Sequence, residues 1–70
     1  PRSKLLNASS IMDIENKNNF QDKVKHTDKV EKIAAKVLKS ENNFSVLDEN
    51  NKIIGTISKK EIIKAIFSDT

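Results

Sequence analysis

The strongest hydrophobic pattern in this chain is a helical one between residues 28 and 40. Apolar side chains occur there at the spacing i, i+3, i+4, i+7 and i+8, at Val30, Ile33, Ala34, Val37 and Leu38. This spacing places them on one face of an amphipathic helix, and lysines occupy much of the other face. Asp28 precedes the run and Glu31 follows it by three residues, which is the spacing of a capping box. The pattern therefore predicts a helix that Asp28 caps.

The segment from Phe44 to Phe67 changes from a strand pattern to a helical pattern. Residues 44–47 and 53–57 are rich in aromatic and β-branched side chains, and Asp48–Asn51 separate them with side chains that close turns. A turn of this length predicts an antiparallel hairpin. Beyond Ser58, one helical face carries Ile62, Ile63, Ile66 and Phe67. Gly55 is the only glycine, and its place in the second strand predicts a bulge or the close approach of a ligand or neighbouring protein segment.

The remaining residues are less regular. We expect a short strand within Phe20–Lys25, and a polar loop over residues 15–19. Residues 1–17 are expected to be a connector, with a short helical turn that Asn7 or Ser9 caps and with apolar contacts from Leu5, Leu6, Ile11 and Met12. The predicted fold class is α+β: residues 18–70 form one domain, ordered β-α-β-β-α, in which two helices cover one face of a small sheet.

Composition narrows the chemistry of the chain. Seventy residues with 36% hydrophobic side chains make one small core, which is usually marginal without a partner. The chain has no cysteine, and His26 is its only histidine, so disulfides and the usual zinc sites are excluded. His26 has no partner in sequence and is expected to be solvated. No apolar run approaches the length that spans a membrane, so we expect no membrane insertion.

The net charge is +3, but the basic residues do not form a nucleic-acid pattern. Only one arginine is present, and no aromatic side chains alternate with the lysines. A solvated lysine-rich surface accounts for the charge, so nucleic acid is not an expected partner. The sequence also contains no paired nucleophile and base and no glycine-rich phosphate loop, so this chain is not expected to be an enzyme.

Residues 46–66, VLDENNKIIGTISKKEIIKAI, resemble the second half of a CBS domain. That family has two apolar residues, an Asp, a polar turn, two apolar residues, a Gly, a Thr or Ser flanked by apolar residues, an acid and an apolar helix. The resemblance implies a regulatory domain, and some members bind adenosine nucleotides between paired units. One departure is Ser45, which stands where the family usually has a proline that shapes the nucleotide cleft.

The resemblance singles out Ser58, Glu61 and Lys59 as cofactor-binding residues. In ligand-binding members the hydroxyl contacts phosphate and the acid holds ribose hydroxyls, while Lys59 and Lys60 would neutralise phosphate charge. The alternative is that Ser58 and Glu61 form a capping box, S-x-x-E, which needs no ligand. The two roles are compatible, so the implied cofactor is either none or an adenine nucleotide.

The resemblance also implies partners. CBS units pair about a pseudo-twofold axis, and a single unit leaves one sheet face uncovered because two short helices cannot bury Val46, Ile53, Ile54 and Ile57 together. We therefore expect a homodimer with an isologous interface. Residues 1–12 are similar to the junction after the ATPase domain in ATP-binding subunits of glycine betaine/L-proline ABC importers. That similarity implies an excised cytoplasmic region that tunes osmolyte import, with transporter subunits as partners. The alternatives are an adenine-nucleotide sensor in another protein and a ligand-free dimerisation module.

Overall fold

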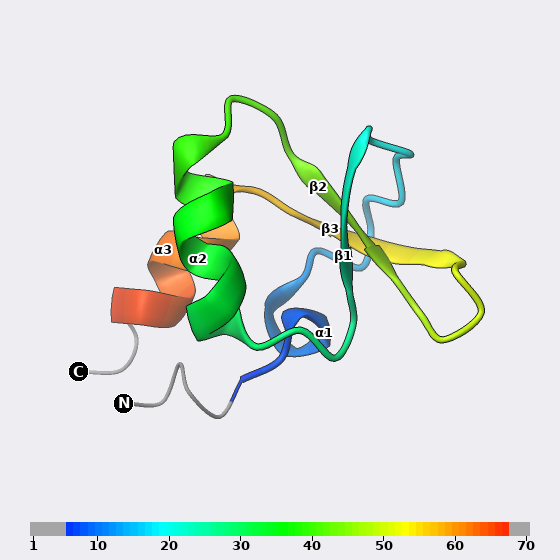
Figure 1. Ribbon diagram of the computed structural model, residues 1–70, viewed down its shortest axis with the longest axis horizontal. Coiled ribbons are helices and arrows are strands. Elements are labelled where there is room, and N and C mark those ends of the chain that lie inside the picture. The colour runs from blue at the N-terminus through cyan, green and yellow to red at the C-terminus, as the bar shows by residue number, and fades with distance from the viewer. Residues whose placement is uncertain (1–5, 68–70) are drawn as a thin grey trace.

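A three-stranded mixed sheet and two longer helices form the body of the protein (Figure 1). The computed structural model describes residues 6–67. In chain order its elements are α1 (Ala8–Ile11), β1 (Asp22–Lys25), α2 (Val30–Lys39), β2 (Phe44–Leu47), β3 (Ile53–Ile57) and α3 (Lys59–Phe67). The strands lie in the order β1-β2-β3, with β1 parallel to β2 and β2 antiparallel to β3. The predicted α+β class and the order β-α-β-β-α are confirmed, although β1 begins two residues later than Phe20.

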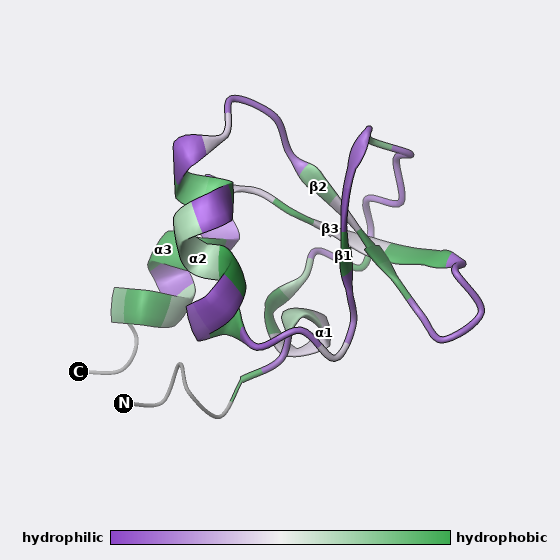
Figure 2. Cartoon of the chain, viewed as in Figure 1, coloured by the Kyte–Doolittle hydropathy of each residue, from purple (hydrophilic) through white to green (hydrophobic). Residues whose placement is uncertain are grey.

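The β2–β3 turn is closed by one aspartate, as predicted. Asp48 Oδ1 accepts hydrogen bonds from the backbone amides of Asn50 at 2.8 Å and Lys52 at 2.9 Å. Asn51 has a φ of 63°, the left-handed conformation that asparagine tolerates. The hydrogen bond from the Lys52 amide is the main reason that the pKa of the exposed Asp48 carboxyl lies below its ordinary value of 3.8. Figure 2 shows this turn as hydrophilic, next to the hydrophobic start of β3.

Helices α2 and α3 lie together on one side of the sheet (Figure 1). Their buried residues, Val30, Ile33 and Val37 of α2 and Ile62 and Ala65 of α3, belong to one core cluster. From the sheet, the same cluster receives Val24, Phe44, Val46 and Ile57. The period predicted for α2 is confirmed as a core face at Val30, Ile33 and Val37. Of the face predicted for α3 only Ile62 is buried, whereas Ile63, Ile66 and Phe67 are exposed. No helix within residues 6–67 is long and apolar enough to cross a membrane.

The predicted capping role of Asp28 is wrong. Lys29 is the N-cap residue of α2, and its side chain makes no capping hydrogen bond. The Asp28 carboxylate instead accepts a hydrogen bond from the Lys25 amide at 2.9 Å, because it closes the tight turn that follows β1. The first amide of the helix, that of Val30, donates to the backbone carbonyl of Leu6 at 2.9 Å. A segment distant in sequence therefore satisfies one of the first amides of the helix, which have no partner within it.

Residues Leu6–Asp13, which we call the strap, run from the turn before α2 to the outer edge of β3. The strap contains α1, which confirms the predicted short helix; Asn7 is its N-cap residue, without a side-chain capping bond, and Leu5 lies outside the described residues. The Asp13 amide donates to the Thr56 carbonyl at 2.8 Å, and the Thr56 amide donates back at 3.1 Å. Ala8 is fully buried in the core. The strap is thus packed into the same core as the sheet and helices, and the division at residues 17 and 18 stays a prediction.

The strap also accounts for Gly55. A Cβ atom on this residue would lie 2.7 Å from Met12 Sδ and 3.0 Å from the Asp13 carbonyl oxygen, so only glycine leaves room for the strap. Opposite Gly55, the β2–β3 register shifts between Val46 and Leu47. The predicted close approach and the predicted bulge are both present, and the neighbouring segment is part of this chain.

The sheet face opposite the helices is covered in part by residues 18–20. Ser45 points to this face, because its neighbours Phe44 and Val46 enter the core and side chains alternate along a strand. Its Oγ donates to the Asn18 carbonyl at 2.7 Å and accepts from the Phe20 amide at 2.7 Å. The four apolar residues that were expected not to be buried together divide into two pairs: Val46 and Ile57 are fully buried, whereas Ile53 and Ile54 are half-buried.

Candidate functional site

The start of α3 is organised by a contact between Ser58 and Glu61. Glu61 Oε1 accepts hydrogen bonds from the Ser58 amide at 2.7 Å and from the Ser58 hydroxyl at 2.6 Å. The acid thus satisfies the amide that precedes the helix, which is one half of the predicted capping box. The hydroxyl donates to the same carboxylate oxygen. Both side chains are half-buried, and the contact fixes the position of the Glu61 carboxylate.

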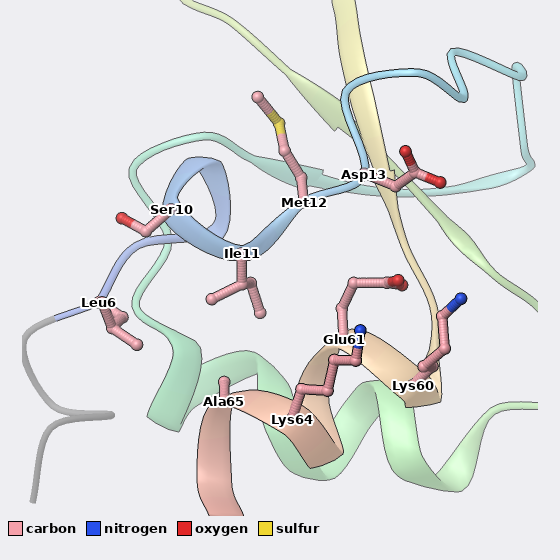
Figure 3. A pocket seen from close by; sticks show the side chains of 9 residues that line it. All are labelled: Leu6, Ser10, Ile11, Met12, Asp13, Lys60, Glu61, Lys64 and Ala65. Atoms are coloured by element: carbon pink, nitrogen blue, oxygen red, sulfur yellow. The ribbon is translucent and has the colours of Figure 1, made fainter. Parts of the chain in front are cut away.

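An open groove of about 630 Å³ lies between the strap and α3. Its walls are formed by Leu6, Ser10, Ile11, Met12, Asp13, Lys60, Glu61, Lys64 and Ala65. Figure 3 shows Ile11 reaching from the strap toward α3, while Glu61 and Lys64 reach from α3 toward the strap. The groove exists because the strap binds the edge of β3 and the turn before α2, which leaves the side facing α3 open.

The groove combines opposite charges with an apolar lining. Lys60 and Lys64 contribute two ammonium groups from successive turns of α3, and Asp13 and Glu61 contribute two carboxylates. Leu6, Ile11, Met12 and Ala65 supply apolar surface. A ligand with an anionic group, hydroxyl groups and a flat or apolar part would find a partner for each of them here.

Of the three residues predicted from sequence, only Glu61 lines the groove. Ser58 is connected to it through the Glu61 carboxylate, and Lys59 lies outside it. Lys60, the neighbour of Lys59, does line it. Sequence reasoning missed Lys64, which the i, i+4 spacing from Lys60 could have indicated. It also missed Ser10 and Asp13, for which the sequence offers no signal because a distant segment brings them to the site.

Two other places carry polar groups without forming such a site. A smaller hollow of about 330 Å³ is lined by Phe20, Gln21, Glu41, Asn42 and Asn43, none of which is cationic. The sequence predicts a solvated His26 without a partner, but in the structure its Nε2 atom lies 3.3 Å from Glu49 Oε2. Within residues 6–67, no group of three His, Cys, Asp or Glu side chains is placed to hold a metal ion.

Comparison with known proteins agrees with this architecture. A family model described as CBS domain matches residues 8–68. The trimethylamine N-oxide transport system ATP-binding protein TmoW of Pelagibacter ubique (strain HTCC1062) is 38% identical over 69 residues. That match covers 97% of this chain and 20% of the relative, so the chain spans about a fifth of the relative's length. No solved structure gives a significant match.

Proposed function

The chain belongs to the CBS domain family, and we propose from that premise that it is the regulatory domain of an ABC importer's ATP-binding subunit. The observation that carries the proposal is the 38% identity, over 97% of this chain, to a transport ATP-binding protein. The cargo in this proposal is a small osmolyte, glycine betaine or L-proline. Its partners are the other transporter subunits, and it acts at the cytoplasmic face of the membrane. A CBS domain regulates rather than catalyses, so ATP hydrolysis belongs to residues outside this chain.

Uptake measurements test this proposal. Residues 8–67 are deleted from the gene that encodes this chain, and uptake of labelled glycine betaine, L-proline and trimethylamine N-oxide is measured over a range of osmolarity. We expect uptake of at least one compound to persist while its dependence on osmolarity changes. Lys59→Ala serves as the control, because Lys59 is exposed and outside the groove. The proposal is refuted if none of the three compounds is taken up, or if the deletion leaves the osmotic response unaltered.

We further propose that two copies associate through α2 and α3. The support is the position of exposed apolar side chains on these helices: Leu38, Ile63, Ile66 and Phe67 are 38–69% exposed. Burying an isoleucine side chain contributes about 1.5–3 kcal/mol, and an isologous interface buries each contact twice. This surface replaces the sheet face on which the sequence argument for a homodimer was based, because residues 18–20 cover part of that face.

Sedimentation equilibrium of two matched variants tests the dimer. Ile63 on α3 and Ile14 beyond the strap are both exposed, at 45% and 61%. Ile63→Ser should weaken association at least tenfold, whereas Ile14→Ser should leave it unchanged. The measurement is repeated over a range of salt concentrations, since an osmotic sensor of this kind should dimerise in a salt-dependent way. A wild-type chain that stays monomeric at all concentrations, or an equal effect of the two substitutions, contradicts the proposed interface.

A second candidate function is adenine-nucleotide sensing in the groove, and the mixed lining of the groove favours it. Lys60 and Lys64 would pair with phosphate, while Glu61, held by Ser58, would accept ribose hydroxyl groups. Calorimetric titration with AMP, ATP and S-adenosylmethionine tests it. Lys60→Ala should weaken binding about tenfold, as expected for a lost charge-assisted hydrogen bond. Lys59→Ala is the matched control, and equal losses in both variants, or no binding of any of the three compounds, would exclude nucleotide binding at this groove.

A further inference from the structure

The strap is held to the rest of the protein by main-chain hydrogen bonds and by the packing of Ala8, Leu6, Ile11 and Met12 against the core. The amides of Ala8 and Ser9 donate to the carbonyls of Asp28 at 2.8 Å and His26 at 3.2 Å. The Leu6 carbonyl accepts from Val30, and Asp13 exchanges two hydrogen bonds with Thr56. On one side the strap borders the open groove. All of these bonds can break together without disturbing a hydrogen bond between two strands of the sheet.

One buried group opposes the docked position of the strap. Asn7 Oδ1 is buried and has no hydrogen-bond partner among the described residues. The side chain does not cap α1 either, although Asn7 occupies the N-cap position. A buried oxygen without a partner loses the hydrogen bonds that water would supply, which lowers an equilibrium constant about five- to a hundredfold. Undocking lets water restore those bonds, so the unpaired oxygen lowers the free-energy cost of releasing the strap.

We propose that the strap is a releasable latch: residues 6–13 dock and undock as a unit while the sheet, α2 and α3 stay folded. The unpaired Asn7 oxygen sets how easily the latch opens. Opening removes the Leu6 carbonyl from the first amide of α2 and uncovers Gly55, so it loosens the start of α2 and one wall of the groove together. The proposal does not depend on any ligand or transporter assignment.

Native-state hydrogen exchange of the 70-residue chain, followed residue by residue by NMR, tests the latch. The reporting amides are those of Ala8, Asp13 and Thr56, and the reference amide is that of His26, which donates to Leu47 at 2.8 Å between β1 and β2. We expect the three reporting amides to share one protection factor that is lower than that of His26. If they exchange as slowly as His26, the strap opens only when the whole protein unfolds, and the proposal is overturned.

Two substitutions at Asn7 should move the latch in opposite directions. Asn7→Ala removes the unpaired oxygen without removing a capping bond, and should raise strap protection relative to His26 about five- to a hundredfold. Asn7→Asp places a carboxylate at this position and should lower the protection of the strap amides, because a buried charge costs more to desolvate than a neutral oxygen. Asn19→Ala is the control, since Asn19 is exposed. Dividing the protection factors of the strap amides by that of His26 cancels any change in global stability. An unchanged ratio in Asn7→Ala overturns the proposal.

Discussion

Substitution of Gly55 tests how the strap and β3 fit together. In Gly55→Ala the new Cβ would meet Met12 Sδ at 2.7 Å, Met12 Cγ at 2.9 Å and the Asp13 carbonyl oxygen at 3.0 Å. The methionine can rotate away, since its side chain is flexible. The carbonyl cannot move freely, because it accepts the Thr56 amide at 3.1 Å. The substitution therefore shifts the strap or lengthens that hydrogen bond.

The expected loss of stability follows from two opposing terms. Overpacking a buried site costs about 1–3 kcal/mol. Gly55 does not have a positive φ, so alanine can adopt its backbone conformation, and restricting the unfolded chain returns about 0.4–1 kcal/mol. With mid-range values of both terms, the net loss in free energy of unfolding is about 1.3 kcal/mol, within limits of about 0–2.6 kcal/mol. For a domain of this size each kcal/mol lowers the melting temperature by about 4–8 °C.

A double-mutant cycle with Met12→Ala identifies the cause. Urea denaturation followed by circular dichroism gives the free energy of unfolding of the wild type, the two single variants and the double variant. If Met12 is the group that the new Cβ displaces, Gly55→Ala should be less destabilising in the Met12→Ala background by about 1 kcal/mol. Additive effects would show that the Asp13 carbonyl, not Met12, is the group that limits the space. No measurable destabilisation by Gly55→Ala in either background would argue that the strap does not lie against Gly55 as described.

Three further predictions concern single side chains. Ser45→Ala leaves the Asn18 carbonyl and the Phe20 amide without their partner, and should lower the free energy of unfolding by about 1–3 kcal/mol in urea denaturation; a loss under 0.5 kcal/mol would contradict this. Glu61→Ala should lower stability by about 0.5–2 kcal/mol in thermal melts, with Glu61→Gln closer to the wild type, because the glutamine can still accept from Ser58; equal losses would argue against the capping role. The Asp48 carboxyl has a pKa below 3.8 in the folded protein, so its contribution to stability is complete above 3.8 and is lost as pH falls through the lower, folded value. Asp48→Asn should reduce the loss of stability over this pH range. If the variant loses stability with acid as steeply as the wild type, the lowered pKa of Asp48 is refuted.

The hairpin and both longer helices could be predicted because their signals are local. The turn chemistry of Asp48 and Asn51 and the helical period of Val30, Ile33 and Val37 depend on residues a few positions apart. The Ser58–Glu61 contact lies within one turn and was found for the same reason. The helix pattern also contained Lys64 at i+4 from Lys60, although the prediction named only Lys59 and Lys60.

The strap could not be predicted because its contacts join residues far apart in sequence. Nothing near Asp13 indicates that it pairs with Thr56, and nothing near Leu6 indicates that its carbonyl accepts a hydrogen bond from the first amide of α2. Asp28 has the sequence spacing of a helix cap, but its carboxylate accepts a hydrogen bond from the Lys25 amide instead. The strap forms one wall of the groove, so Ser10 and Asp13, which line that wall, could not be predicted for the same reason. Gly55 was the one local sign that another segment approaches.

Because main-chain hydrogen bonds help to hold the strap, its tolerance of substitutions differs from position to position. Side chains at Ser9 and Ser10 are exposed, so most replacements there should be neutral in a saturation mutagenesis screen scored by folded yield. Proline at Ala8, Ser9 or Asp13 should be rejected, because each of these residues donates its amide hydrogen. Larger residues should be rejected at Ala8, which is fully buried. Homologous chains can therefore diverge at positions 9 and 10 while keeping the path of the strap, provided that proline is avoided, the small residues at 8 and 55 persist, and positions 6, 11 and 12 stay apolar.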